Sequence, residues 1–168
     1  MKNPIHPATD PVPEGFRPLR VGGPFMQETG PLYGRLIQEQ GRHRVWIGFR
    51  VQERHTNPLG VCHGGMLATL ADMLAAISVP YQTDLPRHFL PTVSLQMDFL
   101  APARLGAWVQ AQIDVLKTTR NLIFTQGLLT ADGEPALRVS AIYKIGPLFQ
   151  GEDAAVGDPF GLLGADPK

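Results

Sequence analysis

Several features that mark large classes of protein are scarce in this sequence. The 168 residues include a single cysteine, Cys62, so no intrachain disulfide can form and a reducing compartment is expected. The 15 basic and 15 acidic side chains balance, and no run of basic residues occurs. A nucleic-acid or membrane-surface partner would normally leave such a basic signature, so neither is expected.

Signals for export and membrane insertion are also missing. The N-terminus lacks the basic and then apolar layout of a secretory signal. The longest apolar run, from Gly64 to Pro80, is interrupted by Asp72 and is short for a membrane span. The sequence therefore predicts a soluble, cytoplasmic protein with one hydrophobic core.

Proline and glycine are concentrated at the two ends of the chain. Residues 1–29 hold six prolines, which predicts an irregular arm with at most a short helical turn. Residues 146–168 are rich in glycine, proline and aspartate, which predicts a loose tail. The folded domain is expected to cover residues 30–145.

Alternating apolar and polar residues within this domain predict five or six strands. The predicted strands cover residues 33–39, 44–51, 92–99, 109–115, 122–130 and 137–145. Asp132-Gly133 predicts a tight hairpin turn between the last two. The three long strands that end the domain have short connections, so they are expected to be antiparallel neighbours.

A run rich in alanine, leucine and methionine, residues 66–79, predicts a helix that ends at Pro80. The run is apolar on nearly every face, so the helix should be buried nearly all round. A few antiparallel strands can bury such a helix only by wrapping around it. The predicted fold class is therefore α+β, with a hotdog architecture in which a curved five- to six-stranded antiparallel sheet surrounds one central helix.

Two glycines, Gly64 and Gly65, stand where this helix begins. The first turn of a helix has backbone N–H groups without partners and carries partial positive charge. These groups could polarise a carbonyl group and stabilise an oxyanion. Alternatively, the glycines only allow tight packing of the turn.

The only acid in the helix is Asp72. Its apolar neighbours would raise its pKa by desolvation, which would make it a base near neutral pH. Equally, it could be a structural carboxylate bonded to backbone or hydroxyl groups. Asn57 has the same ambiguity, because its amide could orient a water or a carbonyl group, whereas Asn57-Pro58 is also an ordinary turn dipeptide.

Other catalytic designs fit poorly. Cys62 and His63 are adjacent and point in different directions, so they cannot form a nucleophile–base pair. Cys62 is expected to be a small buried side chain, and His63 a residue that shapes the entry to the helix. The histidines lack the spacing of metal ligands, and no serine elbow, phosphate loop or dinucleotide fingerprint is present. No metal and no cofactor are expected.

The segment from Asn57 through His63-Gly64-Gly65 to Asp72 resembles the hotdog-fold acyl-CoA thioesterases. It is most similar to the phenylacetate-pathway (PaaI-type) branch of the hydroxybenzoyl-CoA thioesterase superfamily. The resemblance covers about residues 30–145 and continues through Thr92, Phe99-Leu100-Ala101-Pro102-Ala103, Gly106 and Asp132-Gly133 to near Tyr143.

This resemblance implies a hydrolase that cleaves acyl-CoA thioesters to a free acid and coenzyme A. Asp72 would activate a water, or attack as a nucleophile, and the Gly64 N–H would polarise the thioester carbonyl. Asn57 would help to position the thioester or the water. Thr92 would hold the water near the acid, and His63 would shape the loop and contact the thioester.

The resemblance also implies a homodimer or homotetramer with active sites at the dimer interface. The loop residues of one subunit would face the acid and the threonine of the other. No metal or prosthetic group is used, because coenzyme A enters as part of the substrate.

Coenzyme A binding is implied for Gly65, Lys117 and Arg120. Members of the family often have a glycine directly before the basic residue that corresponds to Arg120. In this sequence Thr119 stands in place of that glycine. Contact of Lys117 and Arg120 with the phosphates of coenzyme A is one interpretation, and a solvated hairpin end is the other.

Two further functions stay open from the sequence. A hotdog module could bind acyl-CoA without turnover, although the catalytic acid is kept and the arm is too proline-rich for a helix-turn-helix. A hotdog hydratase or dehydratase would rely on a differently placed histidine, and the acid position matches thioesterases better.

Overall fold

The computed structural model describes residues 11–39, 41–149 and 159–160. Their regular elements, in chain order, are β1 (Arg17–Leu19), α1 (Gly23–Thr29), β2 (Leu32–Glu39), β3 (Arg42–Arg50), the 3-10 turn η1 (Glu53–His55), α2 (Gly64–Gln82), β4 (Thr92–Phe99), β5 (Trp108–Thr118), β6 (Leu122–Ala131) and β7 (Glu134–Lys144).

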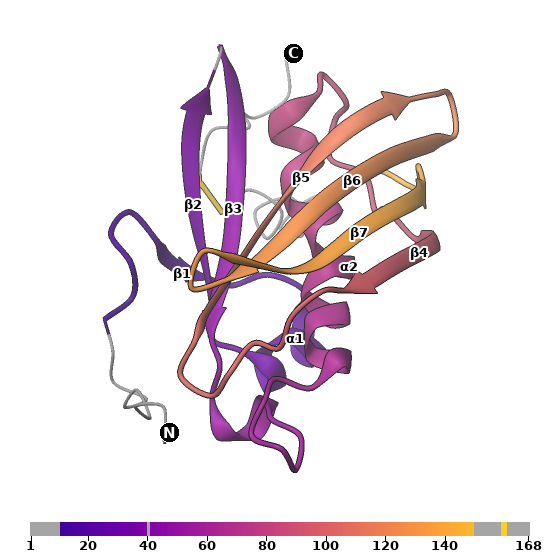
Figure 1. The fold of residues 1–168 in the computed structure, drawn as a ribbon. Helices are drawn as coiled ribbons and strands as arrows, with labels where there is room; N and C mark the ends of the chain where they lie inside the picture. Colours follow the sequence, from indigo (N-terminus) through magenta and orange to yellow (C-terminus); the bar gives the residue numbers. More distant parts are fainter. Residues whose placement is uncertain (1–10, 40, 150–158, 161–168) are drawn as a thin grey trace.

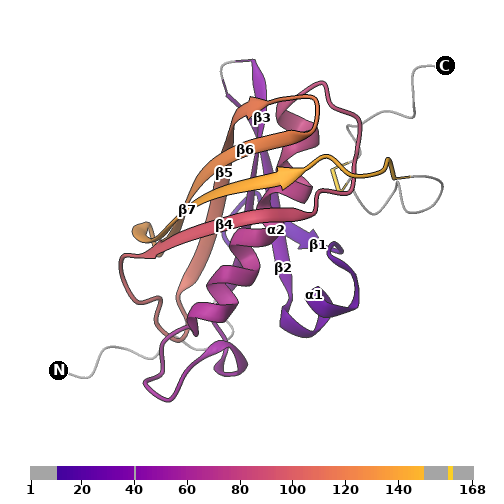
Figure 2. The ribbon, with the colours of Figure 1, turned by 90° about the vertical axis from the view of Figure 1, so that its right-hand side faces the viewer.

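The strands form one antiparallel sheet in the order β1-β2-β3-β5-β6-β7-β4. The sheet curves around α2, as Figures 1 and 2 show from two sides. This arrangement confirms the predicted hotdog fold. The expected neighbours β5, β6 and β7 lie side by side, and Asp132-Gly133 forms the turn between the last two with φ angles of 50° and 90°.

The core lies between α2 and the concave face of the sheet. Leu70 and Leu74 of the helix have no exposed surface, and neither do Ile47 and Phe49 of β3. Burial of each such side chain stabilises the fold by roughly 1.5–3 kcal/mol. Packing against the sheet therefore fixes the position of α2, the element on which the candidate site is built.

The expectation that α2 is buried nearly all round is wrong. Gly65, Asp72 and Ala76 are exposed, and their spacing places them on one side of the helix. The sheet ends with β4 on this side, since β4 pairs only with β7. No described strand lies beyond β4 to cover the stripe.

The helix does not end at Pro80 as predicted, but continues to Gln82. A proline removes one backbone hydrogen bond, here to Ala76, which is exposed. Only two residues follow, so little of the helix depends on the lost bond. The complete helix of 19 residues is long and apolar enough to cross a membrane by length and composition alone, a test that a buried core helix also passes.

The segment predicted as an irregular arm contains two regular elements. β1 adds a seventh strand by pairing with β2, and α1 begins at Gly23 with a proline in its first turn. Near the other terminus, Phe160 packs edge-on against Tyr81 with ring centroids 5.5 Å apart. Of the predicted arm and tail, residues 1–10, 150–158 and 161–168 lie outside the described residues.

Candidate functional site

The loop before α2 is held by the side chain of Asn57. Its Oδ1 accepts hydrogen bonds from the backbone N–H of Leu59 at 2.9 Å and of Val61 at 3.4 Å. Its backbone carbonyl accepts from Gly60, which has a φ of 70° that favours glycine. The turn interpretation of Asn57 is therefore correct for its oxygen. The amide Nδ2 has no acceptor among the described residues and can still donate.

His63 is the N-cap of α2. Its Nδ1 accepts from the backbone N–H of Gly65 at 2.9 Å, and its carbonyl accepts from Met66 at 2.9 Å. In a neutral imidazole the proton is then on Nε2, which can donate. The N–H of Gly64 has no acceptor in the described part of the chain. The cap thus uses the N–H of Gly65 and leaves that of Gly64 available at the positive end of the helix dipole.

His55 is a residue that the sequence did not single out. It is only 4% exposed, and its backbone carbonyl accepts from the N–H of His63 at 2.7 Å. Its Nδ1 accepts from the N–H of Gln52 at 3.0 Å, so Nε2 donates to the carbonyl of Thr29, 2.8 Å away. His55 therefore links α1 to the loop of the candidate site. No motif marks it, because its importance comes from contacts with a distant part of the chain.

Burial lowers the pKa of His55, and the nearby charge of Arg54 lowers it further, while the hydrogen bond to Thr29 opposes both effects. The neutral ring is the form that fits the observed hydrogen bonds. Cys62 is buried as expected, and burial raises the pKa of its thiol to about 12. A protonated, covered thiol is a poor nucleophile.

Asp72 and Thr92 meet in the middle of α2. The hydroxyl of Thr92 donates to Oδ1 of Asp72 at 2.6 Å. By strict alternation Thr92 would point away from the helix, but the pairing of β4 with β7 shifts register between Thr92 and Ser94. Such a bulge redirects a side chain. The hydroxyl holds one carboxylate oxygen and leaves Oδ2 for another partner.

The desolvation expected for Asp72 is absent from the single chain, because the residue is exposed. The negative charge of Asp72 nevertheless affects the neighbouring Tyr143. The pKa of Tyr143 is raised, mainly by burial and also by the charge of Asp72. The Tyr143 hydroxyl donates to the backbone carbonyl of Asp72 at 3.4 Å.

The two groups of site residues are separated along the helix. Gly64 and Asp72 are eight residues apart, which at a rise of 1.5 Å per residue is about 12 Å. One thioester carbonyl cannot contact the N–H of Gly64 and a water held by Asp72 at that separation. Within one chain the structure brings Asn57, His63, Gly64 and Gly65 together, and brings Asp72 and Thr92 together, but does not join the two groups.

Lys117 and Arg120 lie at a third place. Both are exposed in the β5–β6 hairpin and form no ion pair with a described carboxylate. Gln82, at the C-terminal end of α2, donates to the carbonyl of Ile113 and accepts from Val115, which anchors this hairpin. The two cations are therefore near the end of α2 opposite to Gly64. Among the described residues, no cluster of His, Cys, Asp and Glu side chains is placed to hold a metal ion.

A hollow of about 290 Å³ opens beside His63, on the side of α1. Six of its seven lining residues carry polar groups, and Met66 is the one hydrophobic residue among them. The lining residues are Glu28, Thr29, Arg54, His55, His63, Met66 and Thr69. A ligand group attached to a carbonyl at Gly64 could enter this hollow.

Comparison with known sequences finds similarity to thioesterases and esterases. Residues 59–136 match the family model of the thioesterase superfamily. PA0474 of Pseudomonas aeruginosa, a protein named as an esterase, is 29% identical over 134 residues, which are 80% of this chain and 97% of the relative. Human acyl-coenzyme A thioesterase 13 is 35% identical over 89 residues, 52% of this chain and 61% of the relative.

Solved structures share the fold. Zebra fish thioesterase superfamily member 2 has a TM-score of 0.57 and 26% identity, over 67% of this chain and 81% of that one. A mutant of the phenylacetic acid degradation protein PaaI from Thermus thermophilus has a TM-score of 0.60 and 24% identity. The match covers 73% of this chain and 98% of that one. A thioesterase protein from Streptococcus pneumoniae, solved with coenzyme A, has a TM-score of 0.60 and 15% identity. The match covers 80% of this chain and 98% of that one.

Proposed function

We propose that this chain, which matches the thioesterase superfamily over residues 59–136 and shares the hotdog fold of a PaaI protein, hydrolyses acyl-CoA thioesters, with Asp72 as general base and the Gly64 N–H as oxyanion donor. The observation that carries the proposal is the unpartnered N–H of Gly64 at the start of a helix that also bears a hydroxyl-bonded carboxylate. An oxyanion donor and a base are the two groups that thioester hydrolysis needs.

In the proposed reaction, Oδ2 of Asp72 takes a proton from a water while the water oxygen bonds to the thioester carbon. The carbonyl oxygen becomes an oxyanion and accepts the N–H of Gly64. The C–S bond then breaks, the thiolate of coenzyme A leaves, and the proton held by Asp72 returns to the products. Thr92 keeps the carboxylate oriented throughout.

The separation of about 12 Å along α2 implies that these groups come from two subunits. We infer a homodimer in which Asn57, His63 and Gly64 of one chain face Asp72 and Thr92 of the other. The exposed stripe of α2 and the free edge of β4 are suited to such an interface. One edge of β4 pairs with no other strand among the described residues, and Val93 and Phe99 of β4 are 59% and 56% exposed. Pairing of such dimers into tetramers is a further possibility of the same fold.

A dimer would also supply the environment that Asp72 lacks in the single chain. Covering the stripe would remove water from around the carboxylate, and desolvation favours its protonated form. In the same assembly, Lys117 and Arg120 of one chain would be available to the phosphates of coenzyme A bound at the loop of the other. A relative of this fold was solved with coenzyme A, which supports that class of ligand.

The direct test is thiol release from a panel of aryl, short-chain and long-chain acyl-CoAs. We expect Asp72→Asn to lower kcat by roughly 10²–10⁴-fold with an unchanged melting temperature, because the change is isosteric. Full turnover by this variant would refute the role of Asp72. Failure of the wild-type protein to release thiol from any member of the panel, despite binding, would favour a sensing module.

The two-subunit site has a separate test by complementation. Gly64→Pro removes the N–H donor, and Asp72→Asn removes the base, so each variant alone should be inactive. After unfolding and refolding together, mixed dimers would contain one site with both groups intact. Recovery of activity only in the mixture supports a shared site, whereas an inactive mixture of confirmed mixed dimers would contradict it.

A further inference from the structure

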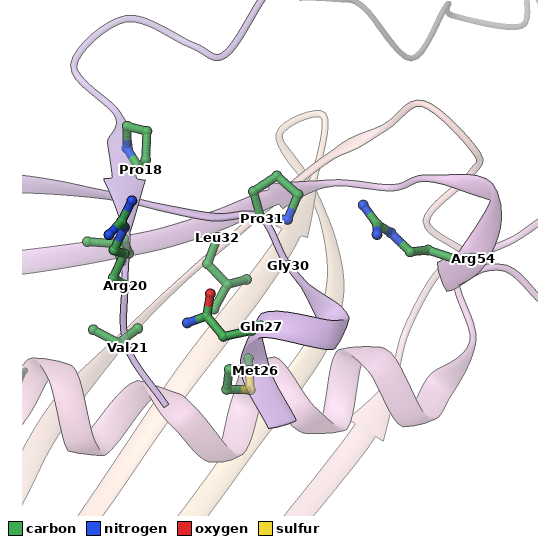
Figure 3. A pocket seen from close by; sticks show the side chains of 10 residues that line it. Pro18, Arg20, Val21, Met26, Gln27, Gly30, Pro31, Leu32 and Arg54 are labelled. Atoms are coloured by element: carbon green, nitrogen blue, oxygen red, sulfur yellow. The ribbon is translucent and has the colours of Figure 1, made fainter. Parts of the chain in front are cut away.

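A second hollow, of about 380 Å³, lies where the N-terminal segment crosses the sheet. Figure 3 shows it between β1, α1 and the turn that holds Arg54. The base of the hollow is apolar, since Leu19, Val21, Met26 and Leu32 are each buried. Polar groups stand around it: Gln27 comes from α1, and Arg20 and Arg54 lie on opposite sides in the view.

The two hollows share one lining residue, Arg54. The first hollow is lined by His63, which precedes Gly64 in the chain, and the second is lined by Arg20 and by residues of α1. The two hollows, with Arg54 common to both linings, are together called the trough here. A substrate group attached to the carbonyl carbon would meet Arg54 part of the way along the trough.

The position of Arg54 is well defined. It lies in η1, between Glu53 and the buried His55, and this turn is closed by the reciprocal bonds of Gln52 and His55. The Nε of Arg54 donates to Oε1 of Gln52 at 2.9 Å, and Nη2 donates to the same oxygen. Its partner is thus a neutral amide that orients the guanidinium without compensating its charge.

Charge along the trough favours an anion. Neither Arg20 nor Arg54 forms an ion pair with a carboxylate in the described part of the chain. Glu28 is the only acid of either lining, so two arginines against one glutamate leave a formal charge of +1. Guanidinium groups bind carboxylate and phosphate oxygens with directed, charge-assisted hydrogen bonds.

We propose that the trough binds an oxyanion of the substrate at Arg54, and that this oxyanion is a carboxylate at the far end of the acyl group. The inference rests on the proposed function and adds the substrate class, acyl-CoAs derived from dicarboxylic acids. The phosphates of coenzyme A are the other source of the same chemistry. The carboxylate is favoured because Lys117 and Arg120 offer cations to the phosphates elsewhere, and because the trough begins beside the carbonyl site.

The test compares two thioesters of similar shape. In glutaryl-CoA the acyl group ends in a carboxylate, and in 5-methylhexanoyl-CoA an isopropyl group replaces it. We expect the wild-type enzyme to prefer glutaryl-CoA in kcat/KM, and Arg54→Gln to lower its value for glutaryl-CoA about tenfold while changing that for 5-methylhexanoyl-CoA by less than about twofold, which corresponds to the loss of about 1.4 kcal/mol of binding. Arg54→Lys should retain part of the preference.

Arg42→Gln is the matched control, because Arg42 is exposed at the start of β3 and lines neither hollow. Equal losses for both CoA thioesters in Arg54→Gln, absent with the corresponding pantetheine thioesters, would keep the oxyanion site and assign it to a phosphate. Hydrolysis of both thioesters with no effect of Arg54→Gln would overturn the inference and leave the proposed function intact. Absence of any thioester hydrolysis would instead contradict the proposed function.

Discussion

The two parts of the candidate site are built in opposite ways. The loop before α2 is closed by hydrogen bonds: Asn57 holds the turn, His55 holds the neighbouring backbone, and His63 caps the helix. Asp72 and Thr92 instead meet through one hydrogen bond on an exposed stripe. The first part is fixed by its own chain, and the second has one open side.

This difference separates function from stability. Substitutions that break the partly buried hydrogen bonds of His55 should destabilise the protein as well as lower its activity. Substitutions at Asp72 and Thr92 should affect turnover with little effect on the fold. The first residue of α2 is an exception within the loop, because the N–H of Gly64 has no partner to lose among the described residues.

Among substitutions in the loop before α2, the largest effect is expected from Gly64→Pro. Proline is well tolerated at the first position of a helix, and His63 before it already has the extended backbone, φ −61° and ψ 135°, that precedes a proline. The variant deletes the proposed oxyanion donor and should lower kcat by roughly 10²–10³-fold. Steady-state thiol release measures this loss.

Gly64→Ala is its control, because it keeps the N–H and adds a Cβ that would lie 3.2 Å from the ring of Phe99. Phe99 is 56% exposed and can shift, so this variant should keep most of the activity. An equal loss in Gly64→Ala would show that space beside Phe99, and not the N–H, is what the reaction needs.

The next effect, on stability, is expected from His55→Ala. The change leaves the N–H of Gln52 and the carbonyl of Thr29 without their partner in a partly buried place, which costs about 1–3 kcal/mol. Urea unfolding measures the loss, and His43→Ala, at a partly exposed histidine, serves as the control with an expected change within about 0.5 kcal/mol. A wild-type midpoint for His55→Ala would mean that the loop is held by its backbone alone.

The sequence predicted the elements of the fold well because they rest on local periodicity. The alternation in residues 92–99 and 109–115 is visible in the chain itself, and so is the helix from Met66. The seventh strand was missed, because three residues with a proline among them carry no alternation. β1 forms because β2 offers it an edge, which is a tertiary cause.

In the candidate site, too, the features that depend on tertiary contacts could not be predicted from the sequence. Gly64 and Asp72 were found because a glycine pair and a lone acid are unusual near an apolar helix. The contact of Thr92 with Asp72 depends on a bulge that reverses the side predicted by alternation, so it came only from the family resemblance. The exposure of Asp72 could not be predicted either, because it depends on β4 being the last strand of the sheet.

A smaller effect on turnover is expected from Thr92→Val, which keeps the shape of the side chain and removes the donor to Asp72. Losing a hydrogen bond to a carboxylate should lower kcat about tenfold, the equivalent of about 1.4 kcal/mol. The melting temperature should change little, since the substitution keeps the shape of the side chain. Thr92→Ser retains the hydroxyl and should recover most of the activity. Equal activity in the valine and serine variants would show that Asp72 needs no orienting group.

The smallest effect is the pH dependence of stability that comes from His55. Because burial lowers the pKa of His55 in the folded state, the unfolded chain takes up a proton first as the pH falls through its ordinary value of 6.5. The free energy of unfolding should therefore fall as the pH drops below about 6.5, with a slope from this residue of at most about 1.4 kcal/mol per pH unit. Urea unfolding at several pH values, with His55→Gln as the reference, isolates this contribution. If both proteins lose stability in parallel below about pH 6.5, the ring of His55 is not the group that links the loop to pH.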